Sequence, residues 1–193
     1  MTFPDNTQGE SQRARKRRLQ EGFFDDYCKG RGLDIGAGND PLFKDIETWD
    51  KMSGHGDATH MLGVPDETYD FVYCSHILEH LDDPWAGIRS WFRILKVGGF
   101  LIVAVPHRDL YEKKFKLPSK WNQEHKKFWV LDRHHNEWTL GLIQTIQEAL
   151  ACSDYRLLLA RINMRDLTNQ FNPDKHSWGE YSIEAVVKKG AIP

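Results

Sequence analysis

The chain has 193 residues, 40% of them hydrophobic, and a formal net charge of −2. That size and composition exclude wholesale disorder and suffice for an α/β domain with a buried core, while the charge gives no overall attraction to nucleic acid. The three cysteines, Cys28, Cys74 and Cys152, are odd in number and widely spaced, which disfavours a disulfide framework and indicates a reducing compartment.

The N-terminal region, residues 1–30, is predicted to be a loose polar tail followed by a helix over residues 11–28. A solvated helix face is the favoured interpretation of its basic residues, and a contact for an acidic substrate or a lid over a cofactor is the alternative. The tail has no apolar signal core and no apolar run would span a bilayer, so we expect a cytoplasmic protein without a membrane span. The basic residues are Arg13, Arg15, Lys16, Arg17 and Arg18.

Residues 32–35 are predicted to be an apolar strand that runs directly into a glycine turn. Gly36 can adopt backbone angles closed to other residues, and Gly38, without a Cβ, leaves room for a ligand against the main chain. At the carboxyl end of a parallel strand, such a turn indicates a nucleotide-like cofactor. A dinucleotide fingerprint would need a third glycine at Pro41, and a Walker loop would need Gly-Lys-Ser/Thr, so neither pattern is present.

The next connections are unusually short. A second strand is predicted over residues 46–50, and only residues 41–45 link it to the glycine turn, whereas a full crossover needs about a dozen residues or more. We therefore expect a clipped first crossover helix. The connection over residues 51–55 is just as short, so the third strand is expected to be brief or missing.

The second half alternates predicted strands and helices. Residues 69–74 are predicted to be a buried strand, counted as strand four. Pro84 opens a helix that ends at Gly98-Gly99, and residues 100–105 are predicted to be a central apolar strand, counted as strand five. Residues 107–136, rich in lysine, histidine and aromatic residues, are interpreted as a substrate-side insertion or lid after strand five. The remaining predictions are a helix and two terminal strands, which complete a single domain over residues 31–193: residues 138–151, 155–162 and 181–188.

Four signals in this order resemble class I S-adenosylmethionine-dependent methyltransferases: Asp34-x-Gly-x-Gly, Asp50, Gly56-Asp57-Ala58, and Tyr69-Asp70-Phe71-Val72 with Leu78-Glu79-His80. Residues 95–101 also resemble the family's junction into strand five. The resemblance implies an α/β, Rossmann-like, doubly wound and mostly parallel sheet, with S-adenosyl-L-methionine as cofactor. Asp40 replaces the usual third glycine of the motif; it would hold the cofactor's ammonium group or cap a short turn, and the cap is favoured.

The resemblance also implies a set of cofactor-binding residues. Asp34 would help hold the ammonium end, Asp50 would accept hydrogen bonds from both ribose hydroxyls, and Asp57 would receive the adenine amino group. Ser75 and His76 follow strand four, where the methionine portion and the sulfonium are expected. The complete cofactor-binding set is Asp34, Gly36, Ala37, Gly38, Asp50, Asp57, Ala58 and Ser75.

Methyl transfer mainly requires aligned reactants and the exclusion of water, and a hydroxyl acceptor must also lose a proton, a task that suits histidine. His107, directly after strand five, is the first catalytic candidate, and His76 is the second. Weaker candidates are His125, His134 and His135. The pattern His76-x-x-Glu79-His80 also matches an inverted zinc-protease motif. In some relatives that act on catechols, nearby acidic and histidine residues hold a divalent metal, and His76 takes the place of one such acid here. Structural packing is the favoured role of Glu79 and His80, metal binding is the alternative, and no metal site is predicted.

The acceptor is expected to be a small molecule or a glycan, with a hydroxyl favoured over nitrogen. The insertion's aromatic residues would wall a pocket for a ring or form a satellite core, and its lysines would suit an anionic substrate. One alternative is a protein that binds the cofactor without transferring its methyl group. Another is a nucleic-acid methyltransferase, which Cys74-Ser75-His76-Ile77 disfavours because amino-methylating relatives carry Asn/Asp-Pro-Pro-aromatic there. The sequence leaves the oligomeric state open.

Overall fold

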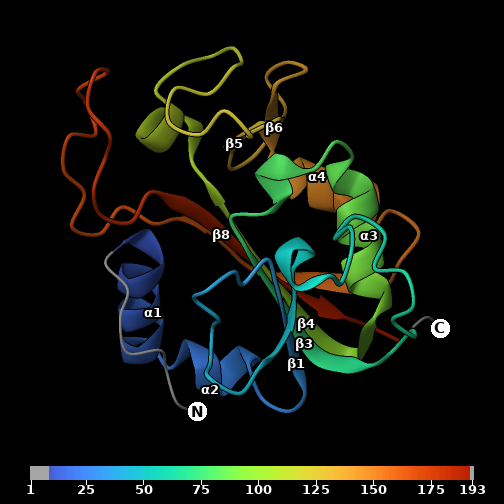
Figure 1. Cartoon of the computed structure of the whole chain (residues 1–193). Coiled ribbons are helices and arrows are strands. Elements are labelled where there is room, and N and C mark those ends of the chain that lie inside the picture. The colour runs from blue at the N-terminus through green and yellow to red at the C-terminus, as the bar shows by residue number, and fades with distance from the viewer. Residues whose placement is uncertain (1–8, 192–193) are drawn as a thin grey trace.

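A six-stranded sheet forms the centre of the fold, in the order β2-β1-β3-β4-β8-β7 (Figure 1). The computed structural model describes residues 9–191, so most of the polar tail lies outside the described residues. Strands β1 to β4 pair in parallel, and β8 is antiparallel to both β4 and β7. The strands are β1 (Gly32–Ile35), β2 (Glu47–Trp49), β3 (Tyr69–Ser75), β4 (Leu95–Pro106), β7 (Tyr155–Ile162) and β8 (Ser182–Lys189).

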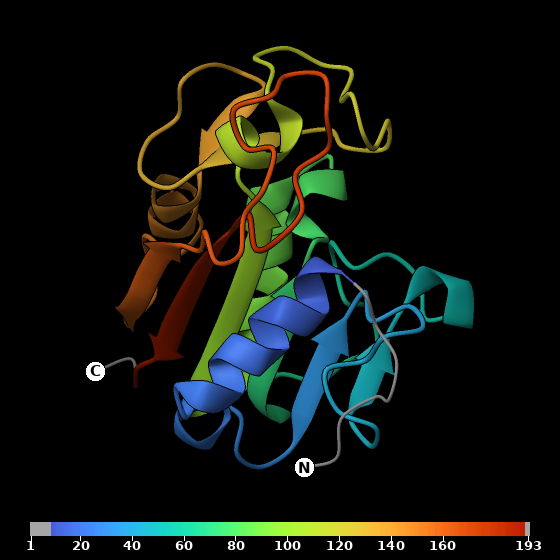
Figure 2. The ribbon, with the colours of Figure 1, turned by 90° about the vertical axis from the view of Figure 1, so that its left-hand side faces the viewer.

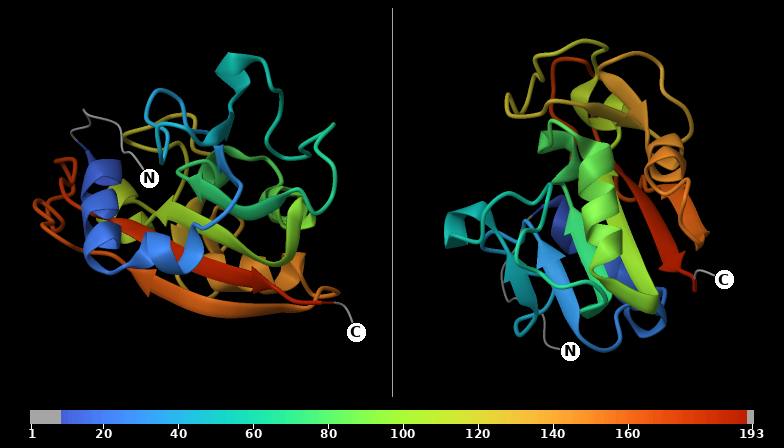
Figure 3. Two further views of the ribbon diagram at one scale, coloured as in Figure 1. Left: turned by 90° about the horizontal axis from the view of Figure 1, so that it is seen from below. Right: turned by 90° about the vertical axis from the view of Figure 1, so that its right-hand side faces the viewer.

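Helices cover both faces of this sheet. Helices α1 (Glu10–Gln20) and α2 (Phe23–Tyr27) lie on one face, and α3 (Pro84–Arg93) and α4 (Leu142–Ala149) lie on the other (Figures 1 and 3). Alternate side chains of β4 therefore enter different cores: Leu101 packs in the cluster under α3 and α4, while Ile102 packs in the cluster with Phe23. The predicted doubly wound, mostly parallel sheet is confirmed.

The short connections also agree with prediction. Among the described residues no helix lies between β1 and β2, and no strand lies between β2 and β3. β3 and β4 therefore correspond to the strands called four and five in the sequence analysis. Leu42 and Phe43 fill the space of the clipped helix, since Phe43 contacts the rings of Phe24 and Phe71 edge-on. The region before β3 is left with one 3-10 turn, Lys51–Ser53.

Three element boundaries differ from the prediction. The N-terminal helix is interrupted at Gly22, whose left-handed backbone separates α1 from α2. Helix α3 ends at Arg93, and Gly98-Gly99 lie inside β4, because the backbone amide groups of Glu67 and Thr68 bond the carbonyls that end the helix. Strand β6 (Thr139–Gly141) precedes α4 and pairs with β5 (Phe128–Val130), where continuous helix was expected.

A cap of loops lies over the carboxyl ends of the parallel strands. It contains a short π-helical turn, Arg108–Glu112, the β5–β6 pair and the loop of residues 163–181, which runs beside the insertion (Figure 2). The His176 ring lies 5.0 Å from the Tyr111 ring and 5.3 Å from the Trp121 ring, so part of the insertion is a satellite core. No helix in the described part of the chain is long and apolar enough to cross a membrane.

Candidate functional site

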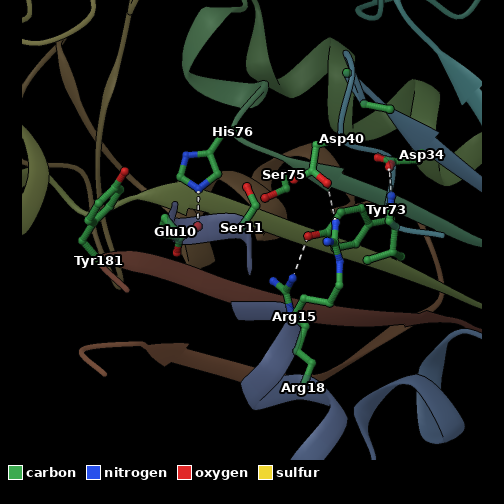
Figure 4. Close-up of a pocket in the computed structure, with 13 residues that line it drawn as sticks. Glu10, Ser11, Arg15, Arg18, Asp34, Asp40, Tyr73, Ser75, His76 and Tyr181 are labelled. Carbon is green, nitrogen blue, oxygen red and sulfur yellow. Dashed lines mark hydrogen bonds and ion pairs between the residues drawn. The ribbon is translucent and has the colours of Figure 1, made fainter. Parts of the chain in front are cut away.

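A pocket of about 280 Å³ lies between α1 and the carboxyl ends of β1 and β3 (Figure 4). The structure brings five of the predicted site residues to it: Asp34, Gly36, Ala37, Ser75 and His76. Among the other lining residues, sequence reasoning gave an individual role to Asp40 and to none of the rest. The other lining residues come chiefly from α1 and the loop after β1. These are Glu10, Ser11, Arg15, Arg18, Asp40, Leu42, Tyr73 and Tyr181.

Asp34 is a buried carboxylic acid at the end of β1. Its Oδ2 accepts a hydrogen bond of 2.7 Å from the backbone N–H of Leu42. Burial raises the pKa of Asp34 to about 7, although this hydrogen bond and the charge of Arg15 act in the opposite direction. A cationic group that entered the pocket would therefore favour the ionised carboxylate.

The glycine turn holds the end of β1 against β2 and β3. Gly36 has a φ of +77°, and a Cβ at this position would lie 2.0 Å from Cδ1 of Ile77, so any other residue would need both a strained backbone and a shift of the Ile77 side chain. Gly38 has a φ of +52° and open space around the position of a Cβ. Its N–H donates to Oδ2 of Asp50 at 3.0 Å. Gly38 and Asp50 thus lie beside the pocket without lining it.

Asp57 and Ala58 lie in the long loop between β2 and β3. Oδ1 of Asp57 accepts a hydrogen bond from the N–H of Thr59 at 2.8 Å, and the carbonyl of Ala58 accepts one from Nε1 of Trp91 at 2.8 Å. Neither residue lines the pocket. The structure therefore leaves the predicted adenine-binding pair outside the cavity that the other elements form.

The burial of the basic residues of α1 beside the pocket is the main site feature that the sequence analysis did not predict. Arg15, Arg17 and Arg18 are buried, so the solvated-face interpretation is wrong for these three residues. Nη2 of Arg15 lies 2.9 Å from Oδ1 of Asp40, and Asp40 is thus an ion-pair partner instead of a turn cap. α1 covers the pocket in the position of the lid considered as the alternative (Figure 4).

Glu184 of β8 anchors α1 to the sheet. Its carboxylate, fully buried, pairs with Arg18 at 2.5 Å, with Arg17 at 3.2 Å and with Arg161 at 2.9 Å. Burial opposes ionisation of Glu184, but the three guanidinium groups outweigh it and lower the pKa to about 2. A glutamate in the otherwise apolar run of β8 was the one sequence signal for this network.

His76 joins the pocket wall to α1. Nε2 of His76 lies 3.0 Å from Oε2 of Glu10, and Nδ1 lies 3.5 Å from Oε1 of Glu79. Burial disfavours the imidazolium form, but the two carboxylates, Glu10 first, outweigh it and raise the pKa of His76 to about 10. While these contacts persist at neutral pH, His76 is a cation that donates protons and is not a base.

His107 is not brought to the pocket. This residue is buried; its backbone N–H donates to the carbonyl of Tyr181 at 2.8 Å, and its Nδ1 accepts from the N–H of Asp109 at 3.1 Å. Burial lowers the pKa of His107, so the imidazole is neutral near pH 7. In this arrangement His107 caps the π-helical turn and is hydrogen-bonded to the backbone of the pocket-lining residue Tyr181.

Comparison with known proteins adds the family context. A family model described as "Methyltransferase domain" matches residues 18–103. Two ubiquinone biosynthesis O-methyltransferases, from strains MJ11 and ATCC 700601 / ES114 of Aliivibrio fischeri, are 35% identical over 71 residues. That match covers 32% of this chain and 30% of each relative, so the chain matches under a third of these relatives' length.

Solved structures share the whole architecture. A S-adenosylmethionine-dependent methyltransferase from Thermotoga maritima, described as a possible histamine N-methyltransferase, has a TM-score of 0.55 at 19% identity, covering 94% of this chain and 91% of that one. One from Archaeoglobus fulgidus has a TM-score of 0.54 at 16% identity, covering 94% and 95%. The resemblance to class I methyltransferases is therefore confirmed: residues 18–103 match the methyltransferase family model, and the chain has the Rossmann-like fold of the solved methyltransferases.

Proposed function

We propose that this protein binds S-adenosyl-L-methionine in the pocket beneath α1 and transfers its methyl group to a small-molecule or glycan acceptor. The observation that carries the proposal is the buried Asp34 carboxyl, which lines a pocket at the end of a glycine turn within a methyltransferase domain. The matched domain spans residues 18–103 and thus includes the glycine turn, Asp50 and β3.

The polar groups of the pocket fit the amino-acid end of this cofactor, which carries an ammonium and a carboxylate. Asp34 is the proposed partner of the ammonium group. Arg15 is the proposed partner of the carboxylate, because its buried Nε has no hydrogen-bond partner among the described residues. Oε1 of Glu10 is a buried acceptor without such a partner as well. A zwitterion would satisfy groups of both signs in one cavity.

The rest of the cofactor would extend from this cavity along the glycine turn. Asp50, already bonded to the N–H of Gly38, is the proposed partner of the ribose hydroxyls. The open space beside Gly38 gives the ribose room against the main chain. Asp57 and Ala58 are the proposed adenine contacts, and their loop would close over the base.

Bound S-adenosyl-L-methionine would supply a methyl group already activated on its sulfonium. The task of this chain's residues is then to align the acceptor and to exclude water, and α1 covers the pocket for that purpose. His76, cationic in this arrangement, is the proposed donor that orients the acceptor. His107, neutral near pH 7, is the proposed base, and it would have to release the N–H of Asp109 to accept a proton at Nδ1.

A hydroxyl acceptor is favoured by the local identity to proteins named as O-methyltransferases. The test has two stages. Calorimetry with S-adenosylhomocysteine should show one binding site that Asp34→Ala weakens and that Asp25→Ala, an exposed control on α2, leaves unchanged. Transfer of labelled methyl to catechols, sugars, nucleotide sugars and amines should then identify the acceptor class. The absence of binding would reject the proposal, and binding without transfer to any class would favour a non-catalytic cofactor-binding protein.

A further inference from the structure

Three potential metal ligands meet next to the pocket, on the far side of His76. Glu79 and His80 come from the turn after β3, and His125 comes from the insertion after β4. One oxygen of Glu79 and one ring nitrogen of each histidine lie within 4.8 Å of one another. The insertion is fixed there because the backbone N–H groups of Lys126 and Lys127 donate to the carbonyl of Glu79 at 2.8 and 3.2 Å.

The Glu79 carboxylate is the strongest single indication of a ligand. It is fully buried, and neither oxygen has a hydrogen-bond partner among the described residues. The nearest ring nitrogens are Nδ1 of His76 at 3.5 Å and Nε2 of His125 at 3.9 Å. A buried carboxylate without hydrogen bonds is costly, and the His76 imidazolium, which lies 3.5 Å away and is shared with Glu10, offsets that cost only in part. A metal cation bound to the Glu79 oxygens would offset that cost.

His125 is oriented as metal-binding histidines are. Its Nδ1 lies 2.5 Å from Oε1 of Glu112, a buried carboxylate whose other oxygen accepts from the hydroxyl of Ser119 at 2.5 Å. A carboxylate only accepts, so Nδ1 carries the proton and the lone pair of a neutral ring is at Nε2, toward Glu79. Carboxylate–histidine–metal chains have this arrangement, in which the outer carboxylate fixes the ring and its tautomer.

We infer that Glu79, His80 and His125 bind one divalent transition-metal ion of the Zn²⁺, Mn²⁺ or Co²⁺ type. Two imidazoles and one carboxylate suit such ions better than Mg²⁺ or Ca²⁺, which prefer oxygen ligands. Ligands about 2.1 Å from a tetrahedral ion lie about 3.4 Å apart, so binding draws the three side chains together. Three protein ligands leave a coordination position open, as in catalytic sites.

The position of this site gives it a use that rests on the proposed function. His76 contacts Glu79 and also lines the cofactor pocket, so an acceptor on the open coordination position would lie beside that pocket. A metal ion lowers the pKa of a bound hydroxyl, which then loses its proton near neutral pH either to water or to the base proposed at His107. Such an ion would orient and activate a hydroxyl acceptor.

Metal binding is tested directly, without cofactor or acceptor. The full chain, untagged and stripped with a chelator, is titrated with Zn²⁺ against a competing chelator and with Co²⁺ by visible absorption. We expect one ion per chain and a Co²⁺ spectrum of low coordination number. Glu79→Gln and His125→Asn should abolish tight binding, while His60→Asn, an exposed histidine of the loop before β3, should bind as the unmodified chain does.

Glu112→Gln tests the positioning role of the outer carboxylate. It should weaken Zn²⁺ binding about 10–100-fold without removing the Co²⁺ spectrum. Circular dichroism confirms that each variant is folded, and the unmodified chain alone already decides the main point. Failure of that chain to bind Zn²⁺ more tightly than Glu79→Gln would overturn the metal site. Metal binding in a protein that transfers no methyl group would leave the site intact and reject the proposed function instead.

Discussion

Oε2 of Glu10, at the first residue of α1, lies 3.0 Å from Nε2 of His76, the residue that follows β3. A second ion pair, between Arg15 and Asp40, crosses the same pocket about one and a half helical turns further along. Together they hold α1 over the carboxyl ends of β1 and β3 (Figure 4). The charge state of the pocket therefore depends on contacts between segments that are distant in the sequence.

The Glu10–His76 pair makes a prediction for the ring of His76. In metal-free protein at pH 5–9, NMR should show a His76 imidazole that stays protonated, because its pKa is raised to about 10 against the effect of burial. In Glu10→Gln, the carboxylate that most stabilises the His76 imidazolium is removed while the ring stays buried, so the titration midpoint of His76 should move to lower pH. A midpoint that is the same in both proteins would show that Glu10 does not control the ring.

Cofactor affinity should depend on pH through Asp34. Its carboxyl has a pKa raised to about 7 in the folded protein, and the proposed ammonium partner binds only the ionised form. Affinity for S-adenosylhomocysteine should therefore level off near pH 8, where the ligand still carries its ammonium group, and fall about tenfold per pH unit below pH 7. Calorimetry in two buffers should detect the proton that binding releases. Asp34→Asn should bind weakly with little pH dependence, and an equally steep profile in that variant would contradict the assignment.

The two glycines of the turn form a matched pair of variants. Alanine at either position must adopt a left-handed backbone, at a cost of about 1–2 kcal/mol of unfolding free energy. Only Gly36→Ala also drives a Cβ into Ile77, which adds about 1–3 kcal/mol of overpacking. Denaturant unfolding should thus rank Gly36→Ala below Gly38→Ala. Gly38→Ala should instead weaken cofactor binding, because its new methyl group occupies the open side of the turn.

Glu184→Gln should strongly destabilise the fold. It leaves Arg18 buried without its carboxylate, and breaking a buried ion pair in this way costs about 3–5 kcal/mol. Arg17 keeps its ion pairs with Glu180 and Glu21. Because folding lowers the pKa of Glu184 to about 2, its contribution is complete above about pH 5 and disappears as pH falls toward 2. The stability gap to the unmodified chain should shrink over that range. Glu124→Gln, an exposed control in the insertion, should change stability by less than about 0.5 kcal/mol.

Local patterns predicted much of the sheet. The bounds of β1 and β7 follow from apolar runs ended by turn residues, and the lack of a described strand between β2 and β3 agrees with the expectation that the third strand is brief or missing. The end of α3 was not predictable in this way. Its last carbonyls bond the backbone before β3, and that partner is a matter of tertiary packing.

The site was only partly predictable from the sequence, again because several of its contacts depend on tertiary packing. Asp34 and the glycine turn are adjacent in sequence, so their proximity is local. Arg15 and Arg18 looked like a solvated helix face because their acidic partners, Asp40 and Glu184, lie in other segments. The insertion's His125 meets Glu79 only after the chain folds back over β3. Charge patterns along a helix do not reveal what the fold places opposite them.

The position of β8 has a consequence for how the protein matures during translation. β8 lies between β4 and β7 in the sheet yet follows both in the chain, and β7 joins the sheet only through β8. A nascent polypeptide that still lacks β8 can neither seat β7 nor pair Arg18 with Glu184. α1 therefore finds its anchor on the strand of this sheet that comes latest in chain order, so the covered cavity cannot be completed before β8 has been synthesised.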